Sequence, residues 1–267
     1  MTVLIVVLAV LGVYVAFRSV APLLRGSSCT AAGDGEDISL DTAQAGIAAT
    51  IAGVAQRDAL TPRAVTIAYA AALQESKLQD LTYGDRDSVG VFQQRPSQGW
   101  GKRSNLENPE FATSKFFGAL AKVPGYRRIP VYQAAQDVQH SADGFAYQQY
   151  QPLAEHMTAA FTGQDPHAVW CWYSPGIRGT ARVAAARVEL AATFGPQTTR
   201  ATADPGLIVL AGGVRQGWAM AAWLVSHAQQ YQIDDVSYAG YQWTAANGTR
   251  GWSRTVSPAP PGTVEVG

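Results

Sequence analysis

The chain has 267 residues, which fits one large domain or two small ones against a typical domain of about 150 residues. Lysine plus arginine and aspartate plus glutamate both number 20, so the net charge is zero, and a nucleic-acid partner is not expected. Charged residues make up only 15% and hydrophobic residues 47% of the chain, a composition that provides a core and excludes a disordered protein.

The N-terminus is predicted to be a membrane anchor. Residues 3–17 carry no charge, and the apolar character resumes after Arg18 and continues to residue 24. As a helix, this stretch would span roughly 33 Å, enough for a bilayer core. Only two residues precede it, too few for the basic region of a cleaved signal peptide. We therefore expect an uncleaved transmembrane helix within residues 1–25.

Residues 26–36 are predicted to be a linker, and helices follow it. The expected helix starts carry capping or proline signals, at Asp41, Thr61-Pro62, Asn108-Pro109 and Pro130. Apolar residues then recur at helical spacing. A helical domain is therefore expected over 37–171, with one long loop at 79–106.

The C-terminal third is predicted to differ. We expect a connecting helix within 172–200, a small α+β domain over 201–256 with a hairpin-type turn at Asn247-Gly248, and a flexible tail over 257–267. The four tryptophans of this region are expected to fill a small core rather than to bind sugar. The predicted fold class is mainly α, with an N-terminal transmembrane helix and a small C-terminal α+β domain.

The predicted chemistry lies at the end of the second helix. Glu75 stands at the C-terminal end of an apolar, Ala-rich helix, where the helix dipole and apolar neighbours disfavour the ionised carboxylate, which suits a general acid. The following loop is rich in glycine and polar residues and suits close approach by a ligand. Trp100 adds an aromatic plate on which a sugar ring could stack. On the residues alone, a solvated glutamate at a helix end is the alternative.

Two motifs in this region resemble a known family. Glu75-Ser76, followed 18 positions after the glutamate by Gln93 at the end of the string SVGVFQ, resembles the signature of soluble lytic transglycosylases, members of the lysozyme-like superfamily. The longer string YGDRDSVGVFQQRPSQGWG resembles the lysozyme-like domains of membrane-anchored actinobacterial cell-envelope proteins. The resemblance covers residues 29–171 and implies a lysozyme-like helical fold for 37–171.

The resemblance also implies a reaction, cleavage of the β-1,4 bond between N-acetylmuramic acid and N-acetylglucosamine in peptidoglycan. Glu75 would protonate the glycosidic oxygen, while the substrate's acetamido group supplies the nucleophile. Glu75 would then act as a base on the sugar's own 6-hydroxyl or on water. Ser76 would brace Glu75, and Gln93 would hold substrate or the loop. The other residues expected to bind substrate or support the site are Ser88, Gly90, Gln94 and Gln139.

Asp85 and Asp87 leave the reaction type open. A second carboxylate near the acid could position a water molecule and favour plain hydrolysis. The alternative, which we prefer, is that both aspartates form turns in the loop.

One departure from the family leaves a second function open. Lytic transglycosylases usually carry a later Ala-Tyr-Asn-Ala-Gly segment whose tyrosine and asparagine line the cleft. The region expected to correspond, residues 135–141, lacks it, and Gln139 and His140 are the candidates to substitute. The alternative function is a non-catalytic peptidoglycan-binding or scaffold protein of the cell envelope.

The two cysteines, Cys29 and Cys171, fit an envelope protein. They stand at either end of the lysozyme-like region, and a disulfide between them would persist only outside the cytosol. Arg18 and Arg25, which follow the apolar stretch, would by the positive-inside rule place that flank in the cytoplasm instead. We follow the cysteines and expect a single-pass cell-membrane protein with an extracytoplasmic body. The expected partners are peptidoglycan and the membrane, with no cofactor and no metal site.

Overall fold

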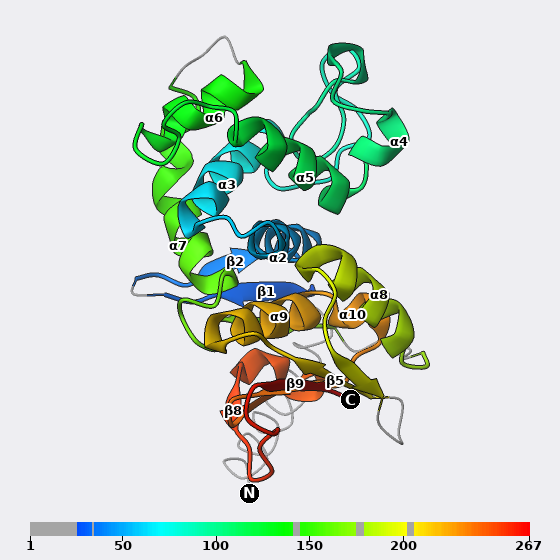
Figure 1. Ribbon diagram of the computed structural model, residues 1–267. Coiled ribbons are helices and arrows are strands. Elements are labelled where there is room, and N and C mark those ends of the chain that lie inside the picture. Colours follow the sequence, from blue (N-terminus) through cyan, green and yellow to red (C-terminus); the bar gives the residue numbers. More distant parts are fainter. Residues whose placement is uncertain (1–25, 34, 141–144, 175–178, 202–205) are drawn as a thin grey trace, which may run out of the picture.

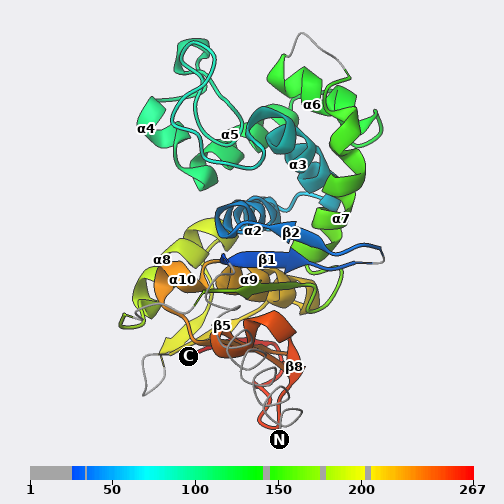
Figure 2. The same cartoon turned by 180° about the vertical axis from the view of Figure 1, so that it is seen from behind.

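The computed structural model describes residues 26–33, 35–140, 145–174, 179–201 and 206–267. Within these ranges the chain forms layers, which Figures 1 and 2 show from opposite sides. Helices lie at one end, and α2 runs through the middle. A three-stranded sheet and α9 come next, and a six-stranded sheet forms the other end.

The described helices and strands have the following bounds. The α-helices are α2 (Thr42–Arg57), α3 (Pro62–Ser76), α4 (Arg103–Leu106), α5 (Pro109–Leu120), α6 (Val131–Gln139), α7 (Gln151–Phe161), α8 (Val183–Phe194), α9 (Val214–Ser226) and α10 (Ala228–Tyr231). The 3-10 helices are η1 (Pro96–Gln98), η2 (Gln148–Tyr150) and η3 (Ala245–Arg250). The strands are β1 (Ser28–Ala31), β2 (Ile38–Leu40), β3 (Val169–Trp172), β4 (Thr199–Ala201), β5 (Leu207–Leu210), β6 (Asp235–Tyr238), β7 (Tyr241–Thr244), β8 (Ser253–Arg254) and β9 (Thr263–Val266).

Capping explains where the helices begin, and the four predicted starts are confirmed. The Asp41 carboxylate accepts a hydrogen bond from the Gln44 amide at 2.7 Å, and the Gln44 side chain accepts one from the Asp41 amide at 3.0 Å, which makes a capping box at α2. Asn108 caps α5 by accepting from the Phe111 amide at 2.9 Å. Proline occupies the first position of α3 and α5 and precedes α6.

Helix α2 is the centre of the core. Every residue from 45 to 55 is buried, so this helix is covered on all sides, and α3, α5, α8 and α9 pack on it. The indole N–H of Trp223 in α9 donates to the Thr50 hydroxyl of α2 at 3.3 Å. The helical part and the C-terminal part of the chain therefore share one core.

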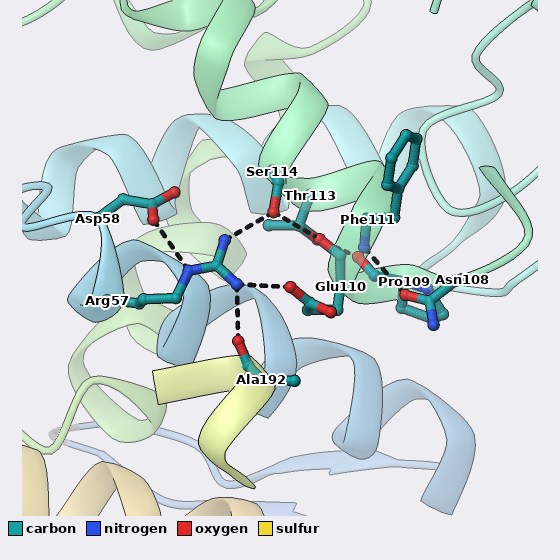
Figure 3. A network of polar contacts seen from close by, with 9 residues as sticks. All are labelled: Arg57, Asp58, Asn108, Pro109, Glu110, Phe111, Thr113, Ser114 and Ala192. Atoms are coloured by element: carbon teal, nitrogen blue, oxygen red, sulfur yellow. Dashed lines mark hydrogen bonds and ion pairs between the residues drawn. The ribbon is translucent and has the colours of Figure 1, made fainter. Parts of the chain in front are cut away.

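Arg57, at the end of α2, ties three helices together (Figure 3). Its guanidinium donates to Glu110 at 2.5 Å and to the Ser114 hydroxyl at 2.7 Å, both on α5. It also donates to the Ala192 carbonyl of α8 at 2.7 Å and pairs with Asp58 at 3.0 Å. This network fixes α5 and α8 relative to α2.

The three-stranded sheet closes the helical part of the chain. Strand β1 lies between β2 and β3 and is antiparallel to both. Cys29 of β1 and Cys171 of β3 face each other in the register and form a disulfide, as expected. The cross-link joins the two strands that flank the helices from α2 to α7 in the sequence.

The C-terminal part is built on a six-stranded antiparallel sheet with strand order β4-β5-β9-β6-β7-β8. Helix α9 packs against this sheet and contributes an almost fully buried segment, residues 217–226. Trp218, Trp223 and Trp243 are buried, and Trp252 is partly buried against the same core. The expectation that the tryptophans fill a core is confirmed.

The predicted fold class is wrong. The described part of the chain is about 47% helical and 14% strand with two antiparallel sheets, a mixed α+β fold rather than the mainly α fold that was predicted. The physical reason is strand length. The strands that the sequence did not indicate, such as β1, β2 and β3, have only three or four residues each, too few for an alternating pattern to emerge in the sequence.

Three predictions outside the helical region also need correction. Residues 26–36, expected to be a linker, contain β1, the middle strand of its sheet. The expected flexible tail, residues 257–267, contains β9, which pairs with both β5 and β6. Asn247 and Gly248 lie in η3 rather than in a hairpin turn. Glycine and proline near these segments masked strands that long-range pairing stabilises.

The predicted membrane placement is corrected as well. No helix in the described part of the chain is long and apolar enough to cross a bilayer. The segment predicted as the anchor, residues 1–25, lies outside the described residues. The disulfide is compatible with a protein outside the reducing cytosol.

Candidate functional site

Glu75 stands in the last turn of α3, where the helix leaves the core. Most residues before it in the helix are buried, whereas the Glu75 side chain is partly exposed. Lys77 ends the helix in the left-handed conformation, with φ of 58°. The next residue, Leu78, is fully buried, and its amide donates to the Ala72 carbonyl at 3.1 Å. Glu75 is therefore presented at the surface by a rigid, anchored helix end.

Tyr147 contacts the Glu75 carboxylate directly. Its hydroxyl donates a hydrogen bond to Glu75 Oε1 at 2.7 Å, and its side chain is fully buried. Among the described residues, Tyr147 is the hydrogen-bond donor to this carboxylate, so Oε2 is left for other partners. Tyr147 was not predicted, because the family's cleft segment was expected to correspond to residues 135–141, which contain no tyrosine. The Ala-Tyr pair at 146–147 is the signal that marks it.

Ser76 joins the end of α3 to the loop that carries the second motif. Its buried hydroxyl donates to the Val91 carbonyl at 2.7 Å and accepts from the Gln79 amide at 3.1 Å. Ser76 was expected to brace Glu75. Its contacts brace the loop beside Glu75 instead.

The loop forms a tight turn next to this helix end. An antiparallel bridge between Val89 and Gln94 closes the turn. Gly90 within it has φ of 76°, and a Cβ at this position would overlap the Leu106 carbonyl oxygen. Only glycine fits there, because it has no Cβ and adopts positive φ without strain. Ser88 is buried at the start of the turn.

Three amide side chains hold the turn in place. Gln93 donates to the Gly90 carbonyl at 3.2 Å, and the buried Gln94 donates to a carbonyl of α5 at 3.1 Å. Gln139, at the end of α6, donates to the Phe92 carbonyl at 2.7 Å. Of the two roles expected for Gln93, the structure shows the one that holds the loop. Gln139 also holds the loop, from the end of α6.

Asp85 and Asp87 lie in this loop, and neither contacts Glu75. The Asp85 side chain is 89% exposed and pairs with its neighbour Arg86 at 3.9 Å. Asp87 accepts from Arg95 Nε at 2.9 Å and from the Ser97 amide at 2.7 Å. The hydrogen bond from Arg95, followed by that from the Ser97 amide, lowers the pKa of Asp87 to about 2. Both aspartates lie in a turn of the loop, where the Ser88 amide donates to the Asp85 backbone carbonyl at 3.0 Å, but the Asp87 side chain reaches Arg95 and Ser97 rather than its own turn.

His140 and Trp100 have structural positions. His140 is exposed and ends α6 in the left-handed conformation, and no hydrogen bond joins it to Glu75 among the described contacts. Trp100 is partly buried against the core. No described contact joins His140 to Glu75, and the stacking role expected for Trp100 stays a prediction.

Two aromatic side chains are exposed in the segments that carry Tyr147 and the braced turn. Phe145, two residues before Tyr147, is 66% exposed, and its ring lies 5.1 Å from that of Tyr132 on α6. Tyr83, in the 79–106 loop, is 71% exposed. Exposed rings of this kind offer apolar faces to a ligand.

The described residues contain no cluster of three or more histidine, cysteine, aspartate or glutamate side chains that could hold a metal ion. The site therefore consists of one oriented carboxylate, a buried tyrosine and a braced polar turn. The Glu75 carboxyl group can donate a proton to a ligand and take one back. No protein-family model and no curated protein matches the chain, so this geometry and the motif resemblance carry the functional argument.

Proposed function

We propose that the protein cleaves the glycan strands of peptidoglycan, with Glu75 as the general acid and then the general base. The observation that carries this proposal is the 2.7 Å hydrogen bond from buried Tyr147 to Glu75 Oε1. Tyr147 holds one carboxylate oxygen from inside the protein, and the Glu75 side chain is partly exposed, so its carboxyl group can pass a proton to a glycosidic oxygen. The resemblance of the Glu75-Ser76 and SVGVFQ motifs to lytic transglycosylases supports the choice of substrate.

The carboxylate arrangement favours the substrate-assisted form of the reaction. Asp87 is engaged by Arg95 and Ser97, and Asp85 points into solvent, so neither is placed to activate a water molecule beside Glu75. In the first step Glu75 protonates the leaving oxygen, and the acetamido oxygen of the substrate attacks the anomeric carbon. In the second step the Glu75 carboxylate removes the proton of the sugar's 6-hydroxyl. That oxygen displaces the acetamido group and gives a 1,6-anhydro sugar.

The surroundings of Glu75 suit a neutral glycan. The exposed rings of Phe145 and Tyr83 offer stacking surfaces, and amides and backbone carbonyls provide most of the polar groups in the braced turn. The balanced charge of the chain provides no net attraction for an anionic polymer. Recognition through stacking and hydrogen bonds follows from this composition.

The test is release of soluble muropeptides from purified peptidoglycan by the full chain. Glu75→Gln keeps the side-chain shape and removes the proton donor, so we expect the rate to fall by about 100- to 10,000-fold. Glu155→Gln, on the exposed face of α7, is the matched control and should leave the rate unchanged. Mass spectrometry should find anhydro ends rather than reducing ends.

The same assay separates the non-catalytic alternative. If the wild-type protein and Glu75→Gln both sediment with peptidoglycan and neither releases fragments, the protein is a binding module and the catalytic proposal is wrong. If neither cleaves nor sediments, a scaffold role is the remaining candidate. Cleavage that yields reducing ends would keep the enzyme and overturn the anhydro mechanism.

A further inference from the structure

A cavity that Glu75 does not line lies at the junction of α2 with the end of α9 and α10. Its volume is about 450 Å³, within the range of small-ligand sites. Residues of α2 form one wall, and Ser226 and His227 form the other. Asp80, from the loop that follows α3, lines it as well, whereas Glu75 does not. Figure 1 shows α2 between the upper helices and the layer that holds α9 and α10.

Ser226 is the first sign that this cavity takes a ligand. Its side chain is only 4% exposed, and its hydroxyl has no hydrogen-bond partner among the described residues. A buried hydroxyl without a partner destabilises a fold, and most such groups are satisfied by protein or by bound molecules. Ser226 lines the cavity, so a ligand there could supply the missing partner.

His227 is the second sign, because it offers a hydrogen-bond acceptor. Burial lowers the pKa of His227 to about 4, against the opposing effect of its hydrogen bond to the Trp223 carbonyl, so the ring is neutral at pH 7. Nδ1 lies 2.8 Å from that carbonyl oxygen. A carbonyl only accepts, so the proton is on Nδ1, and the lone pair is on Nε2. No described residue donates to Nε2.

Gly46 keeps this acceptor accessible. It lies inside α2 and lines the cavity, and a Cβ at this position would stand 3.1 Å from His227 Nε2. Glycine weakens a helix interior, so its place here needs a reason. The reason that the structure offers is room beside the imidazole.

The remaining lining sets the class of ligand. No lysine or arginine lines the cavity, and Asp80 is its one carboxyl group among the described residues. Burial, with the nearby Glu107 carboxylate, raises the pKa of Asp80 to about 6. Ile47 and Tyr173 add apolar surface to a lining that also carries hydroxyl and amide groups. An anion finds no cation here, whereas a neutral ring with hydroxyl groups and one apolar face matches the lining.

We infer that this cavity binds a single neutral sugar unit, with Ser226 and His227 Nε2 hydrogen-bonding its hydroxyl or amide groups. The site is separate from Glu75 and does not depend on glycan cleavage. Asp80 belongs to the loop that carries the braced turn, so a ligand in the cavity would contact that loop directly.

The test uses the full chain labelled with ¹⁵N-histidine, which has only four histidines, and N-acetylglucosamine as the probe. Titration should shift the His227 Nε2 resonance, identified by its loss in His227→Phe. Ser226→Ala should weaken binding by about 2- to 10-fold, the effect of one hydrogen bond, without lowering the midpoint of urea unfolding. Gly46→Ala should suppress the shift by occupying the space beside Nε2.

Gly118→Ala is the matched control, because Gly118 also lies inside a helix and a Cβ there meets nothing within 4 Å. It should leave the titration unchanged. The experiment is repeated on Glu75→Gln, in which the His227 shift should persist, so failure of the cleavage proposal is distinguishable from failure of this one. The inference is overturned if the His227 resonance stays fixed as the sugar is raised to saturating millimolar levels, or if Gly46→Ala shifts as the wild type does.

Discussion

The hydrogen bond from Tyr147 has two consequences for the Glu75 carboxylate. A phenol that donates to Oε1 leaves the lone pairs of Oε2 as the route for proton transfer, which orients the acid. It also stabilises the carboxylate that remains after the proton has gone, when the group must act as a base. Because Tyr147 is fully buried, this geometry exists before any ligand arrives.

Removing this one hydroxyl should slow the chemistry and spare the fold. Tyr147→Phe keeps the buried ring and deletes the hydrogen bond to Glu75. We expect kcat for muropeptide release to fall by about 10- to 100-fold, since a hydrogen bond to a charged group is worth about 1.5–3 kcal/mol, while KM changes little. Tyr69→Phe is the control, because Tyr69 lies buried on α3, the helix that carries Glu75, and its hydroxyl donates to the Ala48 carbonyl. An equal loss of kcat in both variants would show a structural effect only.

Single residues differ in how far the sequence alone could place them. Glu75, Ser76 and Gly90 were found because they lie in two local motifs. Tyr147 was missed because its contact with Glu75 spans 72 positions of sequence, and a local pattern carries no such pairing. The role of Gln139 also depends on a long-range contact, to Phe92.

At the level of helices and strands, start signals were the most informative. A cap or an N-terminal proline acts within four residues, so the beginnings of α2, α3, α5 and α6 could be predicted. The short strands β1 and β9 could not be predicted from local signals. β1 and β9 form because their partners β3 and β6 lie beside them in the folded chain. The mixed α+β class therefore emerges only with tertiary structure.

The packing of helices on α2 depends on Arg57. Arg57→Ala would leave Glu110 and the Ala192 carbonyl without this partner, partly shielded from water. We expect the free energy of unfolding in urea to fall by about 2–3 kcal/mol, less than for a fully buried ion pair because the side chains are partly exposed. Arg86→Ala, whose ion pair with Asp85 is exposed, should change it by about 0.5 kcal/mol or less. Equal losses of unfolding free energy in the two variants would show that Arg57 does not hold α5 and α8 on α2.

Across the whole molecule, β3 is the strand that both halves use. It pairs with β1 in the three-stranded sheet that closes the helical part, and the Trp243 indole donates to the Cys171 carbonyl of β3 at 3.0 Å. Trp252 donates to the Val169 carbonyl at 2.7 Å. Gly248 lies so close to the Cys171 carbonyl that a Cβ would overlap it. The helical part and the six-stranded sheet are therefore coupled through the strand that carries the disulfide.

This coupling predicts how the molecule responds when the disulfide is removed. Cys29 and Cys171 are 142 positions apart, and a cross-link over so long a loop restricts the unfolded chain by about 4–5 kcal/mol in the entropic account. Cys29→Ala, Cys171→Ala and the double variant should lose similar amounts of stability, because either single change already breaks the bond. Urea unfolding should remain one transition, with helical circular dichroism and tryptophan fluorescence changing together. Additive losses, or a helical part that melts before the tryptophan-rich sheet, would show that β3 does not hold the two parts as one unit.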